Sequence, residues 1–400
     1  MLKSITLTAL DIGTSSIKGV CARKNLVSGE IEILAKSQMP CFGVRNGEVI
    51  KPQDVSKTIS EVKEDLIQKS GIKIKEVLVN ISGPHLFSVS SQGVVSVSRA
   101  DQKISREDIQ RVLKQAEAVN LPSNKEVLEV FPKEFIIDGE GGIKDPLGLE
   151  GMRLEAKVLL CCLFSPILEN LEKAVAEGGF QILEVIPSPL ASSRACLTPQ
   201  QKELGVLLVD IGAGTCSISV FEKGDLIDFA VFPAGSANIT NDIAICLRTE
   251  ISTAERIKKE FATLKQPART SKREKIKIPE KNLVFSKKLL KNIVEARTSE
   301  IFSQVQKSFK KISGGELLPA GVVLTGGGAL LPGIVEFAKQ KLKLPCRIGL
   351  PQNEQLQDPR FSTVWGLLLS GFDFAQGEKE KRIKEGFGEK LKKVFKIFLP

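Results

Sequence analysis

Two short segments, half a chain apart, carry residues suited to holding phosphate. Asp11 precedes the turn Gly13-Thr14-Ser15, and Asp210 precedes the turn Gly212-Ala213-Gly214-Thr215. Glycine lets the backbone approach an anion closely. Consecutive N–H groups in a tight turn, together with hydroxyls, form a nest of hydrogen-bond donors. The predicted phosphate-binding residues are Gly13, Thr14, Ser15, Lys18, Gly212, Gly214 and Thr215.

The two aspartates predict a cation at the same place. An aspartate beside a phosphate nest would repel the phosphate unless a cation lay between them. Mg²⁺ suits this role because it usually retains several of its waters. We therefore interpret Asp11 and Asp210 as outer-sphere Mg²⁺ ligands and Lys18 as a charge facing the β- and γ-phosphates.

Both turns lie between two apolar strands, which makes the pair an internal repeat. In each case an apolar run leads to the aspartate and a second run, Ile17–Val20 or Ser217–Phe221, returns from the turn. Such a pattern predicts a β-hairpin. One copy indicates only a tight hairpin, whereas two copies indicate two related domains that face each other across a nucleotide.

A third glycine-rich turn follows the apolar strand Val322–Thr325. Gly326, Gly327 and Gly328 come next, and a helix is predicted to begin within Leu330–Ile334. A simple strand-to-helix turn is the alternative, but it does not require three consecutive glycines. We expect these glycines to let the backbone pack flat against a base or a ribose.

The composition limits the class of protein. The chain has 400 residues, of which 42% are hydrophobic and 26% charged, as in ordinary soluble proteins of more than one domain. Its net charge of +10 is compatible with nucleic acid, an anionic membrane or acidic partners. No basic stripe with interleaved aromatics is present, so we expect no nucleic-acid binding.

Cysteine usage and hydropathy exclude further classes. None of the eight cysteines forms a C-x-x-C pair and His85 is the only histidine, so a zinc site is not expected. We expect reduced core thiols in a cytosolic protein. The sequence has neither a signal peptide nor an apolar stretch near the roughly 18 residues of a membrane span, so membrane contact would be peripheral.

In this order, the three glycine-rich turns resemble those of the actin-like ATPase superfamily, and the finer match is to the bacterial cell-division family FtsA. The match covers nearly the whole chain. The segments that carry it are Ile81–His85, Phe131–Phe135, Gly142–Leu149, Gly151–Leu154, Pro187–Ser193 and Ala254–Lys258. The resemblance implies bound ATP and Mg²⁺, with Glu255 and Lys258 facing ribose and adenine.

The resemblance also implies an architecture. It is an α/β, actin-like (ribonuclease H-like, duplicated) fold with two facing domains around a nucleotide cleft and an inserted 1C subdomain of the SHS2 type. The expected subdomains are 1A (1–82, 163–197 and 360–375), 1C (83–162), 2A (198–235 and 312–359) and 2B (236–311). Within 1C, Val94–Ser98 alternates like a strand and Ser105 is typical of a helix N-cap.

The chain departs from the family pattern at a few places. Ala213 stands where a glycine is usual, and Lys259-Glu260-Phe261 continues a helix without the usual nearby glycine. The basic stretch 266–281 resembles a divergent surface loop.

The C-terminal residues predict a membrane-binding helix after a charged linker at 376–386. On a helix over 387–400, one face would be apolar and the opposite face basic. The apolar residues are Phe387, Leu391, Val394, Phe395 and Phe398, and the basic ones are Lys392, Lys393 and Lys396. A core helix is the alternative, but phenylalanines opposite lysines after a charged linker favour an interfacial helix.

By resemblance, the protein forms actin-like filaments and binds the C-terminal tail peptide of the tubulin-like FtsZ in 2B. Asn292, Arg297 and Glu300 would line that groove, although solvated helix charges are nearly as good a reading of each. The protein would lie on the cytoplasmic face of the membrane at the division site and help to recruit later division proteins. No residue is identified for positioning the attacking water, so at most slow ATPase activity is expected.

Two rival functions use the same superfamily fold. A type IV pilus scaffold of the PilM type has no need of a terminal amphipathic helix. A sugar kinase needs a carboxylate base beside a polar sugar pocket, and no such cluster is identified.

Overall fold

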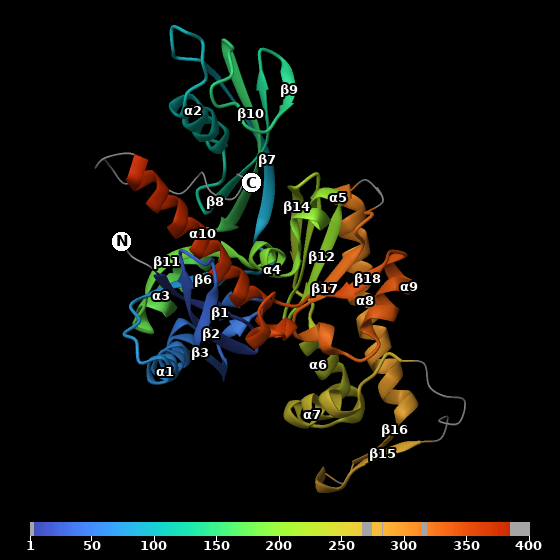
Figure 1. Cartoon of the computed structure of the whole chain (residues 1–400). Helices are drawn as coiled ribbons and strands as arrows, with labels where there is room; N and C mark the ends of the chain where they lie inside the picture. Colours follow the sequence, from blue (N-terminus) through green and yellow to red (C-terminus); the bar gives the residue numbers. More distant parts are fainter. Residues whose placement is uncertain (1–3, 266–273, 282, 314–317, 385–400) are drawn as a thin grey trace.

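Two lobes, each built on a five-stranded sheet of the same topology, face each other in the computed structural model (Figure 1). The structure describes residues 4–265, 274–281, 283–313 and 318–384. The predicted duplicated, actin-like fold is confirmed by this architecture.

The first lobe contains the sheet β11-β6-β1-β2-β3. Its strands are β1 (Ser4–Ile12), β2 (Ser16–Asn25), β3 (Ile31–Pro40), β6 (Glu76–Ile81) and β11 (Gln181–Pro187). β1, β2 and β3 are antiparallel neighbours, whereas β6 and β11 run parallel to β1. Helix α1 (Pro52–Ser70) packs on β2 and β3 and also contacts α3 (Ser165–Glu177). A short hairpin, β4 (Val44–Arg45) and β5 (Glu48–Val49), precedes α1.

The second lobe repeats this order in the sheet β14-β13-β12-β17-β18. Its strands are β12 (Val206–Ile211), β13 (Cys216–Glu222), β14 (Asp225–Phe232), β17 (Val322–Thr325) and β18 (Cys346–Ile348). The first three are again antiparallel and the last two parallel. Helix α9 (Ile334–Leu342) lies beside β18.

Each lobe carries an additional unit. The unit of lobe 1 is the antiparallel sheet β7-β10-β8-β9 with one helix. Its elements are β7 (Phe87–Ser96), α2 (Arg106–Glu117), β8 (Lys125–Ile137), β9 (Glu140–Ile143) and β10 (Arg153–Phe164). The expected strand near Val94 and the Ser105 N-cap are both present, and Asp108 completes a capping box.

The unit of lobe 2 is mainly helical. It contains α6 (Ser236–Leu247), α7 (Ile251–Phe261), the hairpin β15 (Lys275–Ile278) and β16 (Leu283–Ser286), and α8 (Lys287–Ser313). Residues 275–278 were expected to be part of a surface loop. They form a strand instead, because Ile276 and Ile278 are buried while Lys275 and Lys277, which alternate with them, face solvent.

Two helices connect the lobes. α4 (Ser188–Cys196) leads through α5 (Pro199–Leu204) into lobe 2, and α10 (Ser362–Lys384) returns to lobe 1, where it packs on α4, β1 and β6. The expected linker 376–386 is wrong over most of its length, since α10 continues to Lys384. Its glutamate, lysine and arginine residues are good helix formers.

One hydrophobic core lies in lobe 1 and continues onto residues of β12, β13, β14 and β17 in lobe 2, a second lies within lobe 2, and a third lies in the additional unit of lobe 1. All eight cysteines are free, and the expectation of core thiols holds for seven of them, whereas Cys246 is exposed on α6. Among the helices that the structure describes, none is long and apolar enough to cross a membrane.

Candidate functional site

A cavity of about 810 Å³ lies between the two lobes. Its volume is in the range of small-molecule sites. The predicted residues that line it are Asp11, Gly13, Thr14, Ser15, Lys18, Asp210, Gly212, Thr215, Glu255, Lys258, Gly326, Gly327 and Gly328. Of the predicted nucleotide and Mg²⁺ residues, Gly214 alone does not line it. The tertiary structure thus gathers four distant sequence segments around one space.

The first hairpin places Asp11 at the end of β1, directly opposite Lys18 on β2. Lys18 Nζ donates to Asp11 Oδ2 at 2.8 Å. Asn80 Nδ2, at the end of β6, donates to Asp11 Oδ1 at 3.1 Å, while Asn80 Oδ1 accepts from the Ile12 N–H at 2.6 Å. Ser188 Oγ accepts from Asn80 Nδ2 at 2.9 Å. The Asp11 carboxylate is therefore buried and fixed in orientation from two neighbouring strands.

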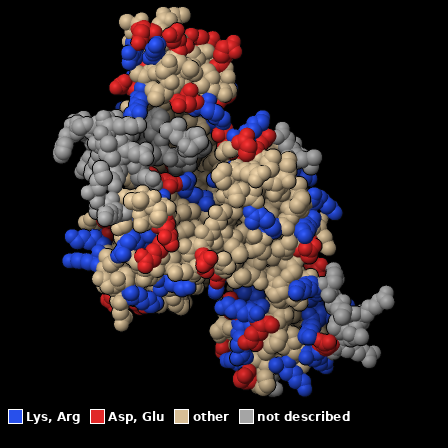
Figure 2. All heavy atoms as spheres, in the orientation of Figure 1, with Lys and Arg blue, Asp and Glu red and all other residues tan. Residues whose placement is uncertain are grey.

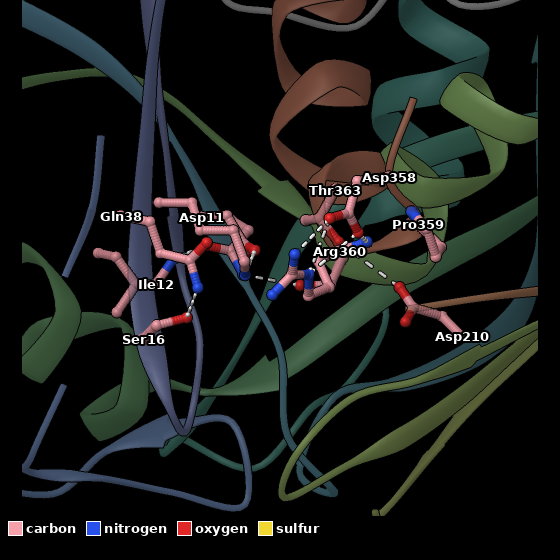
Figure 3. A network of polar contacts seen from close by, with 12 residues as sticks. Asp11, Ile12, Ser16, Gln38, Asp210, Asp358, Pro359, Arg360 and Thr363 are labelled. Atoms are coloured by element: carbon pink, nitrogen blue, oxygen red, sulfur yellow. Dashed lines mark hydrogen bonds and ion pairs between the residues drawn. The ribbon is translucent and has the colours of Figure 1, made fainter. Parts of the chain in front are cut away.

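The second hairpin places Asp210 at the end of β12, at the position equivalent to Asp11. Thr363 Oγ1, in the first turn of α10, lies 3.5 Å from Asp210 Oδ2 (Figure 3). Burial and the nearby Asp11 raise the pKa of Asp210 to about 6. Two carboxylates that line the same cavity form a suitable place for a divalent cation.

The two phosphate turns have the same backbone geometry and touch each other. The Gly13 N–H donates to the Ser16 carbonyl at 3.2 Å, and the Gly212 N–H donates to the Thr215 carbonyl at 2.8 Å. A Cβ atom added to Gly214 would lie 2.7 Å from Thr14 Oγ1, so Gly214 packs against the opposite turn. The Gly47 N–H also donates to Thr14 Oγ1, at 3.0 Å.

Helices α6 and α7 form the wall predicted to face the nucleoside. Lys258 Nζ lies 2.7 Å from Glu255 Oε2 and donates to Thr240 Oγ1 at 2.8 Å and to the Ser236 carbonyl at 3.1 Å. Burial lowers the pKa of Lys258. Burial alone would raise the pKa of Glu255, but hydrogen bonds from Lys258 and Thr240 lower it. The pair presents a fixed donor and a fixed acceptor at the wall of the cavity.

The triple-glycine turn closes the cleft on the side of lobe 2. Gly326 has a φ of +81°, which disfavours any side chain, and its N–H donates to the Pro359 carbonyl at 3.2 Å. Gly327 and Gly328 belong to the 3₁₀ turn η2 (Gly327–Leu330). The turn therefore presents backbone rather than side chains to the cavity.

Several residues of the cleft were not predicted from the sequence. They are Gln38, Gly47, Asn80, Ser188, Ser236, Arg360 and Thr363. Asn80 had a detectable signal, because it interrupts the apolar run Val77–Ile81, and Ser188 lies inside a segment already matched to the family. The others lie on segments whose approach to the cleft only the tertiary structure shows.

The cleft offers few protein ligands for a Mg²⁺ ion. No group of three or more histidine, cysteine, aspartate or glutamate side chains within the described part of the chain could hold a metal ion. A Mg²⁺ ion here would have Asp11 and Asp210 as protein partners, with phosphate oxygens and waters supplying the rest. The outer-sphere role of the two aspartates stays a prediction.

The predicted partner-binding residues lie together on α8. Asn292 and Glu300 are exposed, but Arg297 is engaged within the chain. Its Nε and Nη2 donate to Asp242 of α6 at 2.6 and 2.9 Å, and its Nη1 donates to Glu300 at 2.6 Å. The predicted membrane helix, 387–400, lies outside the described residues.

Two family models match the sequence. The model "Cell division protein FtsA" matches residues 207–366, and "SHS2 domain inserted in FTSA" matches residues 83–162, which span most of β7 to β10.

Curated relatives are similar over most of their length. The chain is 35% identical to the cell division protein FtsA of Pseudomonas aeruginosa, over 91% of this chain and 89% of the relative. It is 33% identical to that of Bacillus subtilis (90% and 82%) and 30% identical to that of Escherichia coli (97% and 96%).

Solved structures share the fold at low sequence identity. The PilM–PilN type IV pilus biogenesis complex matches with a TM-score of 0.65 at 18% identity, covering 92% of this chain and 98% of that one. MreB5 of Spiroplasma citri bound to ADP matches with a TM-score of 0.53 at 12% identity, covering 95% and 99%.

Proposed function

Because this chain belongs to the FtsA family of cell division proteins, we propose that it binds ATP and Mg²⁺, polymerises, and anchors FtsZ filaments to the membrane. The observation that carries the nucleotide part is the pair of equivalent hairpins, whose aspartates and donor turns face one cavity.

The cleft fits a magnesium nucleotide in three respects. Both turns line the cavity with backbone and hydroxyl groups of the kind that form a phosphate nest. Asp11 and Asp210 offer negative charge for the cation, and Glu255 and Lys258 offer fixed polar groups for the nucleoside. Mg²⁺ would neutralise charge between the carboxylates and the phosphates. No residue is assigned to activate water, so we expect slow turnover, with ATP acting mainly to close the cleft.

Binding measurements test this proposal directly. Titration calorimetry of the full chain with ATP, with and without Mg²⁺, is expected to show tighter binding with the cation. Asp11→Asn and Asp210→Asn are expected to abolish that gain while keeping the fold. Asp65→Asn, a change on α1 outside the cavity that removes an ion pair with Lys69, is the control. Equal affinity with and without Mg²⁺ in the unaltered protein would contradict the metal assignment.

We place the FtsZ tail on the unit formed by α6, α7, β15, β16 and α8. This unit carries many lysines and arginines on the face shown in Figure 2. The exposed apolar side chains Ile245, Ile251, Val284 and Leu289 lie in the same unit. A peptide with apolar and acidic residues is the kind of partner that such a surface attracts. Asn292, Arg297 and Glu300 of α8 are the proposed contacts.

We further propose that residues 387–400 bind the anionic membrane as an amphipathic helix. One such helix binds weakly, with each lysine contributing about 1 kcal/mol near an anionic leaflet. Filament formation would bring several helices together and strengthen attachment through avidity. The protein would then act at the cytoplasmic face of the membrane at the division site, where later division proteins could dock.

The rival functions have less support. The likeness to the PilM–PilN complex extends to the fold, at 18% identity, whereas the relatives at 30–35% identity are cell division proteins. If the protein were a sugar kinase, it would phosphorylate at least one sugar of a test panel in the presence of ATP. We expect no such activity.

A further inference from the structure

Arg360 is a cation of the cleft with no assigned role. It belongs to the 3₁₀ turn η4 (Pro359–Phe361), which links lobe 2 to α10, and it lines the cavity. Its Cγ lies 3.7 Å from the position of a Cβ atom on Gly327, so the side chain passes over the triple-glycine turn. In Figure 3 it stands between Asp11 of lobe 1 and Asp210 of lobe 2.

Asp358 holds the Arg360 guanidinium in a fixed orientation. Arg360 Nε donates to Asp358 Oδ1 at 3.1 Å and to Oδ2 at 2.9 Å, and Nη2 donates to Oδ2 at 2.5 Å. Asp358 is in turn fixed as the N-cap of η4, where it accepts from the Arg360 N–H at 2.9 Å. Arg360 Nη1 has no hydrogen-bond partner among the residues that the structure describes. An arginine carries five N–H donors in one plane, so this fork leaves donors for a ligand.

The lysines that line the cleft differ from Arg360, because they pair with acids that also line it. Lys18 pairs with Asp11, and both Lys258 and Lys259 pair with Glu255. Arg360 differs because its acid, Asp358, is not among the cavity-lining residues. A nucleoside triphosphate remains negatively charged even with one Mg²⁺, so an oriented guanidinium at this place would complement it.

We propose that Arg360 binds the polyphosphate of the nucleotide, with Asp358 as the residue that positions its guanidinium. This rests on the proposed ATP binding and adds a phosphate contact from the segment that leads into α10. The contact would tie the bound phosphates to the connection between the lobes.

Calorimetry with ATP·Mg²⁺ and with adenosine separates a phosphate contact from a base contact. Arg360→Ala is expected to weaken ATP·Mg²⁺ binding roughly 10- to 100-fold, the size expected for a charge-assisted hydrogen bond, and to leave adenosine binding unchanged. Arg360→Lys is expected to lose less affinity for ATP·Mg²⁺, because an ammonium group keeps the charge but cannot form the two-pronged hydrogen bonds of a guanidinium. Arg99→Ala is the matched control, since Arg99 forms the same kind of fork with Asp101 in the inserted unit.

The outcomes separate this inference from the function on which it rests. If the unaltered protein binds no ATP, the nucleotide proposal fails before any variant is made. If it binds ATP and Arg360→Ala binds equally well, or loses adenosine in the same proportion, the phosphate contact is overturned. Should Arg360→Ala fail to fold, Arg360→Lys carries the same comparison.

Discussion

Gly214 shows how little space separates the two phosphate turns. Its backbone conformation is open to other residues, but an added Cβ would meet three atoms of the Thr14 side chain within 3.1 Å. Thr14 cannot move freely, because its hydroxyl accepts the Gly47 N–H. The glycine is therefore needed for the approach of the lobes rather than for a special turn.

We expect Gly214→Ala to push the turns apart and to weaken ATP·Mg²⁺ binding about tenfold, since overpacking of this kind costs about 1–3 kcal/mol. Gly141→Ala is the control, because an added Cβ there meets nothing closer than 3.6 Å. Calorimetric affinities of the two variants would decide, and an unchanged affinity of Gly214→Ala would show that the turns separate without cost.

Lys202 of α5 is a largely buried cation that lies over the Phe221 ring, with Nζ 4.8 Å from the ring centroid. Burial, with a smaller contribution from Arg194, lowers its pKa to about 8. The unfolded chain keeps this proton up to about pH 10.5. Between pH 8 and 10.5 the unfolded state thus binds more protons, so the stability of the folded protein rises with pH in this window.

Lys202→Met is therefore expected to stabilise the protein at pH 7, where the full cost of burying the charge applies. The gain is expected to be on the order of 1–3 kcal/mol, reduced by the lost cation–π contact. It should shrink as the pH rises from 8 towards 10.5. Urea unfolding at several pH values measures it, with the exposed Lys173→Met as control. If the gain in the free energy of unfolding did not depend on pH, the pKa of Lys202 would not be lowered by burial.

At the scale of elements, Arg297 links α8 to α6 through its fork with Asp242. Its side chain is only about a quarter exposed. A simple charge reversal at Arg297 would therefore break an internal ion pair as well as any contact with a partner peptide. The two effects have to be separated by an exchange of charges.

Arg297→Glu alone is expected to lower stability and to weaken binding of the FtsZ tail peptide. Arg297→Glu combined with Asp242→Arg is expected to recover the melting temperature, because the opposite charges face each other again. Fluorescence anisotropy with a labelled tail peptide then measures the peptide affinity of the double variant, without the effect of lost stability. If the double variant recovered peptide affinity as well as stability, Arg297 would not be a direct contact of the peptide.

At the scale of the whole molecule, α10 connects the cleft to the C-terminal residues. Thr363 in its first turn approaches Asp210, and the helix continues across α4 and β1 as far as Lys384. The proposed membrane segment begins only three residues later. One continuous helix therefore runs from the cleft to the last described residue.

A truncated chain that ends at Lys384 is expected to keep its affinity for ATP·Mg²⁺ and to lose binding to liposomes of anionic lipid. Sedimentation of both proteins, with and without ATP·Mg²⁺, measures this. The full chain should pellet more strongly under conditions that polymerise it. If the truncated chain pellets equally, the membrane contact lies elsewhere in the molecule.

Features that depend on local chemistry and on repetition could be predicted from the order of the residues. The two aspartate–glycine hairpins, the glycine triplet and the Ser105 cap are set by contiguous residues, and the repeat implied the duplicated fold. The same local reasoning failed at two places. Residues 376–384 have the composition of a linker but continue helix α10, and residues 275–278, where isoleucines alternate with lysines, form strand β15 rather than a loop.

The packing of the elements, by contrast, sets which distant residues complete the cleft and which charges are already paired. Asn80 reaches Asp11 from a parallel neighbour, and Asp242 reaches Arg297 across 55 residues. Arg360 enters the cavity because the connection into α10 passes over the triple-glycine turn. Such contacts depend on the packing of elements against one another, and no local pattern in the chain encodes the spacing that packing creates.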